Sequence, residues 1–254
     1  MNSITKIYKS KFKERLSPYG FSLYRRTFYR VVNDVVQMLM LYNIDTSYTI
    51  AFDVCPLCLG VNDLYCEDVG IQQFRKNNPH NEGWYNQSFF TGQKLSDEEA
   101  EIVVDEMLSI VFSHVMPMFE RIIDWESWLN DVYRQRVNIG RWEVNIKIGN
   151  YGEAILILQE QIERIQNNLL NRDPDYIEKY IREGYVKADY VDEYRARCAA
   201  AENETRELLK FYTNLLERLS IPDNEYFNNH FAEQEAKARE YLSNPRKYKQ
   251  KNGY

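Results

Sequence analysis

The chain has 254 residues, of which 44% are hydrophobic and 28% are charged, and its formal net charge is −6. This length suits one large domain or two small ones, and this composition argues against a disordered chain. Four cysteines are too few for a disulfide-held scaffold of this size.

The N-terminal stretch MNSITKIYKSKFKERL contains no apolar core of the length that a signal peptide needs. The longest uncharged stretches, VVQMLMLYNI and MLSIVFSHVMPMF, are shorter than the roughly 20 apolar residues that span a bilayer. We therefore predict a cytoplasmic protein with no membrane segment.

The first part of the chain indicates a helix followed by an antiparallel sheet. Apolar residues recur at helical spacing from Ile4 to Leu16, and Pro18 follows. We then expect a strand from Phe21 to about Val32, a turn at 33–34, a strand over 35–42, and a third strand in YTIAFDVCPL. Apolar residues alternate with others in that third strand, which is typical of a sheet with one buried face.

Residues 61–95 break the pattern with Asn, Gly, Pro and scattered aromatic residues, and we interpret them as a long loop. Loops of this length in compact domains are often functional. Ser96 and Glu99 then form a capping-box signal for a helix that Pro117 should kink or end near its last turn.

The second half of the chain is predicted to be all helical, to about Ser243. RWEVNIKIGNYGEAILILQEQI resembles one tetratricopeptide-type helical hairpin that turns at 149–150. A heptad seam runs from Val191 to Leu219, and Pro222 precedes the last helix. The predicted fold class is α+β: an N-terminal helix plus an antiparallel β-meander, followed by an all-helical half. The predicted domains are a sheet domain at 1–95, a helical region packed on it at 96–243, and a disordered basic tail at 244–254.

The motif CPLCLG offers two thiolates separated by two residues, as in half of a zinc knuckle. The nearby candidates for the two further ligands give the set Cys55, Cys58, Cys66 and His80. The alternative is that the third strand continues, Pro56 ends or bends it, and one cysteine is buried as a small hydrophobic residue. We predict no cofactor. His80 is the histidine we would test as a ligand or acid–base group, because it lies in the loop beside Glu82.

No glycine-rich phosphate loop and no hydrolase elbow occurs in the sequence. The hairpin interleaves guanidinium and aromatic groups, which could suit single-stranded nucleic acid, but a pI of about 5.3 opposes that interpretation. We therefore predict no nucleic-acid partner.

The segments LSPYGF at Leu16–Phe21 and RTFYR at Arg26–Arg30, followed by YTIAFDVCPL, resemble the bacterial family called domain of unknown function 4304. The resemblance covers roughly residues 1–170. It implies a bacterial cytoplasmic protein with an α+β N-terminal part and a helical continuation, and it carries no catalytic residue to transfer.

Exposed Arg and Tyr side chains are favoured at protein interfaces. The leading hypothesis is therefore a non-enzymatic protein-recognition module, of the immunity or partner-neutralising kind, that uses the sheet face and the 61–95 loop. The competing hypothesis is an enzyme or ligand-binding protein with its site in that loop. The candidate binding residues are Tyr24, Arg25, Arg26, Phe28, Arg30, Trp84 and Tyr85.

Overall fold

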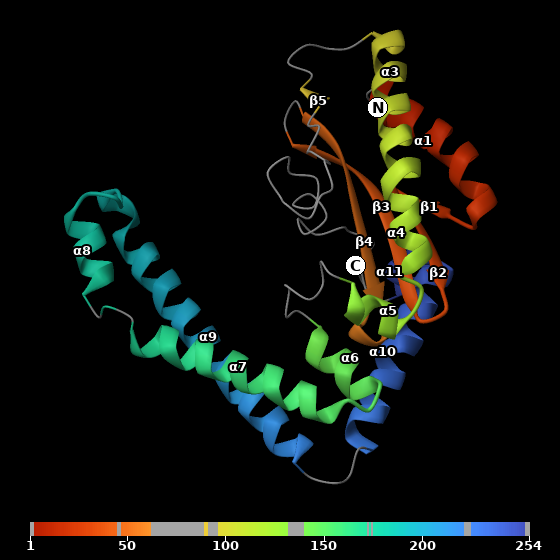
Figure 1. Ribbon diagram of the computed structural model, residues 1–254. Helices are drawn as coiled ribbons and strands as arrows, with labels where there is room; N and C mark the ends of the chain where they lie inside the picture. Colours follow the sequence, from red (N-terminus) through yellow and green to blue (C-terminus); the bar gives the residue numbers. More distant parts are fainter. Residues whose placement is uncertain are drawn as a thin grey trace. The chain divides into compact units, whose positions relative to one another are not determined.

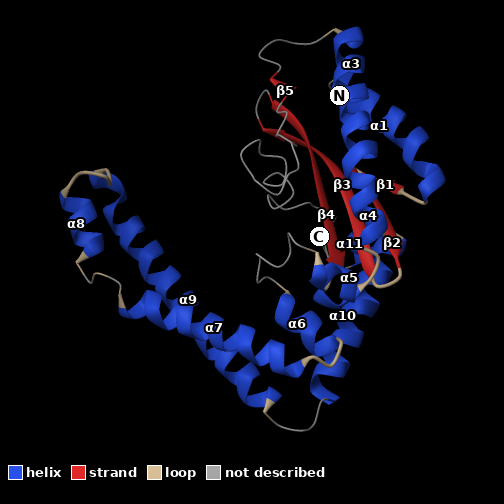
Figure 2. Ribbon diagram, in the orientation of Figure 1, coloured by secondary structure: helices blue, strands red, loops and turns tan. Residues whose placement is uncertain are grey.

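The computed structural model (Figures 1 and 2) describes residues 3–44, 47–61, 89–90, 96–131, 140–171, 173, 175–220 and 225–251. The chain divides into two compact units, one made of residues 1–140 and 229–254, the other of residues 141–228. The fold class is α+β, as predicted, with an N-terminal helix, an antiparallel sheet and a helical C-terminal half. The division differs from the predicted boundaries because the C-terminal helices return to the sheet, which no local pattern reveals.

The first unit is built on one antiparallel sheet with strand order β1-β2-β3-β4-β5, which confirms the meander. Its strands are β1 (Ser22–Tyr24), β2 (Thr27–Val32), β3 (Val35–Ile44), β4 (Ser47–Pro56) and β5 (Phe89–Phe90). The predicted single strand over 21–32 was wrong, because β1 and β2 pair with each other around a two-residue turn at 25–26. Arg25 has φ 55° there. Arginine in the left-handed region is uncommon, so the sequence carries no turn signal at this point.

One face of the sheet is covered by α1 (Ser3–Leu16) and by the helical run of α3 (Asp97–Ile110), η3 (Val111–Val115) and α4 (Met116–Arg121). Ser96 and Glu99 form the predicted capping box. The run contains a π-helical turn, η3, just before Pro117. Proline cannot donate the hydrogen bond that an α-helix requires of it, and the wider turn accommodates this loss.

The run from Asp97 to Arg121 is long and apolar enough to cross a membrane by length and composition, the single such helix in the described part of the chain. Buried residues make up 44% of its most apolar window. Phe119 packs against Phe52 of β4, with ring centres 6.5 Å apart. Because a core helix passes the same test, the absence of a membrane segment stays a prediction.

The other face of the sheet is covered by α10 (Glu225–Ser243) and α11 (Pro245–Lys251). Ala238, Tyr241 and Leu242 join a buried cluster with side chains of β2, β3 and β4, and Tyr248 packs on it. The Tyr29 hydroxyl donates a hydrogen bond of 3.0 Å to the Leu242 carbonyl. Residues 245–251, predicted to be disordered, are therefore helical, because Tyr248 anchors them to the core.

Two buried side chains of the first unit donate hydrogen bonds to backbone carbonyls of other elements. In α5 (Trp125–Asn130), the buried Trp128 ring donates a 2.8 Å hydrogen bond from its nitrogen to the Val54 carbonyl of β4. In β3, the buried Gln37 side chain donates to the carbonyls of Phe119 and Ile122, at 2.6 and 2.9 Å. A side chain of the sheet thus satisfies two carbonyls at the end of α4, which a helix cannot satisfy itself.

The second unit, residues 141–228, is all helical where it is described, and we call it the arm. It contains α6 (Arg141–Lys147), α7 (Tyr151–Leu170), α8 (Tyr176–Arg182), η5 (Ala188–Tyr190) and α9 (Val191–Leu219). The predicted hairpin turn is present between α6 and α7, where Gly149 has φ 82°. The predicted seam forms one continuous helix, α9, but its only fully buried side chains are those of Leu215 and Leu219, near its end. Between Ile165 and Leu215 no described side chain is buried.

Candidate protein-binding surface

The predicted sheet surface does not exist as an open face, because helices cover both sides of the sheet. Phe28 was predicted to be an exposed interface residue, and this was wrong: its side chain is only 1% exposed. Its ring centre lies 5.5 Å from that of Tyr8 and 6.0 Å from that of Phe12, both on α1. Once α1 docks on the sheet, this aromatic side chain belongs to the core.

Arg30, a second predicted interface residue, makes its contacts inside the first unit. Its Nε donates to the Gln37 side-chain oxygen at 2.7 Å, and its guanidinium also donates to the Tyr19 carbonyl at 2.9 Å. The same group lies 4.8 Å from the centre of the Phe21 ring. Burial lowers the pKa of the guanidinium, against the opposing charge of Glu120. Arg30 is therefore a structural residue, and two of its nitrogens already donate hydrogen bonds inside the first unit.

The remaining hairpin candidates sit at or beside the β1–β2 turn. Arg25 and Arg26 are exposed, and the Arg25 guanidinium lies 5.4 Å from the Tyr24 ring centre. Tyr24 is half-buried and packs against the cluster that α10 completes. The structure brings together two exposed arginines at a turn, and not the broad arginine and aromatic face that the sequence suggested.

The candidates Trp84, Tyr85, Cys66 and His80 lie outside the described residues. Cys58 is buried in a short 3-10 turn after β4, and Cys55 is half-buried in β4, which ends at Pro56. Among the described residues, no group of three metal-ligating side chains is close enough to hold an ion. The buried Cys58 and the strand end at Pro56 agree with the structural alternative for CPLC, and the four-ligand zinc site stays a prediction.

An exposed aromatic surface that was not predicted lies on the second unit. The ring of Tyr180 in α8 stacks with three others, those of Tyr176 in α8, Tyr185 in the following turn and Tyr194 in α9. We call these four residues the tyrosine patch. The Tyr180 ring centre lies 4.5 Å from that of Tyr185, 5.6 Å from that of Tyr176 and 6.0 Å from that of Tyr194. Exposure reaches 65% at Tyr185 and 49% at Tyr176.

Local geometry explains how this patch forms. Tyr176 and Tyr180 are four residues apart and share one face of α8. A turn with Gly184 at φ 81° then brings the next tyrosine back beside them. Arg195 of α9 clamps α8 through two hydrogen bonds to the Glu178 carboxylate, at 2.9 and 2.8 Å. The patch is thus held by ring stacking and by a bidentate ion pair between two helices.

The pKa of the Tyr194 hydroxyl is raised by its surroundings in the patch. Partial burial raises its pKa, and a side-chain hydrogen bond with Cys198 raises it further. The Tyr194 hydroxyl therefore stays neutral at physiological pH.

The second unit also contains a buried carboxyl group, that of Glu143. The Oε2 atom of Glu143 on α6 is buried and accepts no hydrogen bond, and burial raises the pKa of this carboxyl from 4.5 to about 7. On α9, burial raises the pKa of Tyr212, with a further rise from the Glu143 charge and an opposing effect of Arg164. No nucleophile or bound group accompanies this carboxyl among the described residues, so we assign it no catalytic role.

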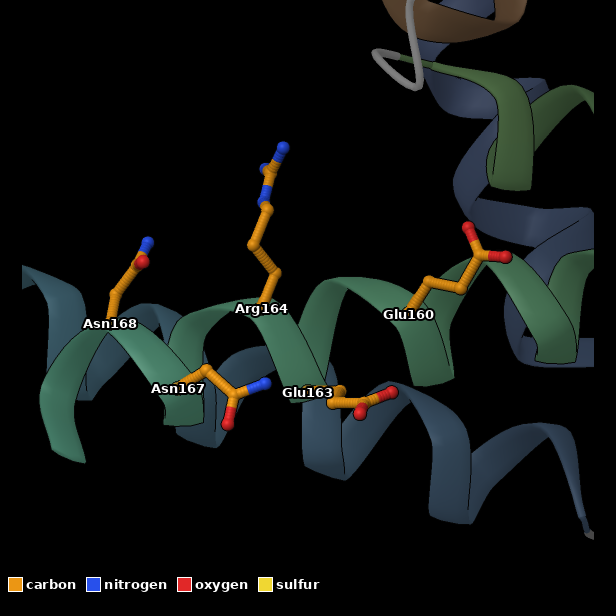
Figure 3. Close-up of a pocket in the computed structure, with 5 residues that line it drawn as sticks. All are labelled: Glu160, Glu163, Arg164, Asn167 and Asn168. Atoms are coloured by element: carbon orange, nitrogen blue, oxygen red, sulfur yellow. The ribbon is translucent and has the colours of Figure 1, made fainter. Parts of the chain in front are cut away.

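A hollow of about 300 Å³ lies along α7 (Figure 3), lined by Glu160, Glu163, Arg164, Asn167 and Asn168. All five side chains come from one helix, and Figure 3 shows that they fan out along it without converging on a point. Arg164 donates a 2.6 Å hydrogen bond to the neighbouring Gln161 side chain. The hollow is therefore a feature of a polar helix surface.

No family model matches this chain, and neither a curated protein nor a solved structure matches it. The resemblance of the N-terminal part to domain of unknown function 4304, and that of the α6–α7 hairpin to a tetratricopeptide unit, therefore stay predictions. The sequence did contain a signal for the tyrosine patch. Tyr176 and Tyr180, and likewise Tyr190 and Tyr194, are spaced four apart in a helical region with few large aliphatic residues.

Proposed function

We propose that this protein is a non-enzymatic protein-recognition module and that its tyrosine patch is the recognition surface. The supporting observation is a set of stacked tyrosines, two exposed and two half-buried, with an ion pair between the helices that carry them. Tyrosine is enriched at interfaces because it has a large apolar ring and a polar tip, and few rotatable bonds. A pre-positioned patch loses little conformational entropy on binding.

The packing of the arm supports the same proposal. No described side chain between Ile165 and Leu215 is buried, although this segment includes most of the 29-residue helix α9. Helices of globular proteins gain most of their stability from packing of an apolar face. A partner on this end of the arm would supply contacts that the unit itself does not make.

The sheet face is not part of this proposal, because α1, α3, α4, α10 and α11 cover it. The cytoplasmic location and the absence of nucleic-acid partners remain our expectations from the sequence. An enzyme or ligand-binding site in the 61–95 loop stays the competing prediction, and its residues lie outside the described ones.

The test is native mass spectrometry of the full chain, purified gently from its own host, in three forms. These are the wild type, a Tyr176→Ser/Tyr185→Ser double variant, and the matched control Tyr19→Ser, which changes a 45% exposed tyrosine of the first unit. We expect a protein partner retained by the wild type and the control and lost from the double variant. A bare wild-type chain, or a partner retained equally by the double variant, would refute the proposal. Far-UV circular dichroism checks that each variant is folded.

A further inference from the structure

The negative charge of this protein is concentrated in the unit that bears the tyrosine patch. Residues 141–228 contain 12 Lys/Arg and 17 Asp/Glu, whereas the rest of the chain contains 20 Lys/Arg and 21 Asp/Glu. Charge of one sign on a module raises the association rate of oppositely charged partners and opposes partners of the same sign. A second copy of this chain, equally acidic in this unit, is therefore disfavoured.

Ion pairs with carboxylates of the same unit engage four of the arm's basic side chains. Arg195 pairs with Glu178, and three further ion pairs lie within α9: Arg197 with Glu193, Arg206 with Glu202, and Lys210 with Glu207. In contrast, no ion pair among the described residues involves Glu183, Asp189 or Glu204. No ion pair among the described residues involves Lys179, Arg182 or Lys187 either, so the surplus of carboxylates belongs to the unit as a whole.

Aromatic faces next to unpaired carboxylates suit one kind of side chain in particular. A guanidinium stacks flat on a tyrosine ring and can also donate two hydrogen bonds to a carboxylate. The same unit contains one such arrangement, since the Arg218 guanidinium lies 4.4 Å from the centre of the Tyr226 ring. Lysine, a compact and strongly hydrated ammonium, would gain less from the rings.

We propose that the partner docks on the tyrosine patch through a positively charged, arginine-bearing segment. This inference rests on the proposed function and adds the chemistry of the partner. Tyr185 and Tyr176 provide the exposed rings, and Glu183 and Asp189, which flank Tyr185 in the chain, provide the carboxylates.

The test measures binding of fluorescein-labelled synthetic peptides to the full chain by fluorescence anisotropy. The peptides have about 12 residues, with Arg, Lys or Glu at the same positions in a Gly/Ser background. We expect the Arg peptide to bind about tenfold tighter than the Glu peptide and about threefold tighter than the Lys peptide. Added salt should weaken binding of the Arg peptide.

Two variants separate this docking from general charge attraction. Tyr176→Ser/Tyr185→Ser should weaken binding of the Arg peptide about tenfold, because it removes the rings and keeps every charge. Glu183→Gln/Asp189→Asn should weaken binding and reduce its salt dependence, and the control Tyr19→Ser should change neither. Equal binding of the Arg and Glu peptides, an Arg-peptide affinity unaffected by the tyrosine variant, or a dimer of the chain in sedimentation that this variant abolishes would overturn the inference.

The two proposals fail in different ways. If the native complex loses its partner in the tyrosine variant, yet the Arg peptide neither binds nor displaces that partner, the partner chemistry is wrong and the recognition surface stands. If the native chain retains no partner, the recognition function itself is wrong.

Discussion

Glu143→Gln should stabilise this protein, and the gain should depend on pH. Burial raises the pKa of the Glu143 carboxyl from 4.5 to about 7, and its Oε2 atom accepts no hydrogen bond. Between these values the folded chain keeps a proton that the unfolded chain has released, so the free energy of unfolding falls as pH rises. Above about pH 7 both states are ionised and the penalty is complete.

The size of the effect follows from the shift. A rise from 4.5 to about 7 corresponds to at most roughly 3 kcal/mol at 1.36 kcal/mol per pKa unit. Because the residue as a whole is only half-buried, solvent screens part of this, and we expect about 1–2 kcal/mol. Glutamine has nearly the same shape and does not titrate, so the variant lacks this pH dependence.

The assay is urea denaturation of the wild type and of Glu143→Gln from about pH 4 to about pH 8, followed by the helical circular dichroism signal. The difference in unfolding free energy should be near zero at the acidic end and should grow through the window to favour the variant. Glu160→Gln, which changes an exposed carboxylate on α7, is the matched control. A difference that is constant with pH, or a variant less stable throughout, would refute the reasoning.

Three other predictions concern the first unit. Arg30→Ala should lower the unfolding free energy by about 2 kcal/mol in urea titrations, because it leaves the buried Gln37 oxygen without a donor, whereas Arg26→Ala at the exposed turn should change it little. Tyr29→Phe removes the hydrogen bond to the α10 backbone and should cost about 1 kcal/mol, seen as faster hydrogen exchange in α10 and α11; unchanged exchange would contradict this. Ser96→Ala breaks the capping box and should cost about 1 kcal/mol, while an unchanged denaturation midpoint would show that the cap contributes nothing.

The elements that sequence reasoning placed correctly depend on local signals. The Ser96 and Glu99 capping box, the apolar spacing of α1 and the alternation in β4 each act within a few residues. The β1–β2 turn was missed for the same reason, since Arg25 adopts a left-handed conformation that arginine does not signal. That conformation is stabilised by the strand pairing on either side of it.

The candidate site was predicted less well than the fold. Phe28 and Arg30 have the chemistry of interface residues, but α1 buries the first and Gln37 engages the second. The tyrosine patch was missed because its members come from α8, a turn and α9, and only the return of α9 alongside α8 brings Tyr194 to Tyr180.

Local signals were enough to predict the α+β class, the β-meander, the start of α3 and the long α9, because periodicity, caps and turns act over short distances along the chain. Which faces remain open depends on the packing of distant segments. That packing covers the second face of the sheet with α10 and α11 and assembles four tyrosines on the arm. The physical reason is that burial depends on which segments pack together, and residues 229–251 reach β2 and β3 across nearly the whole length of the chain.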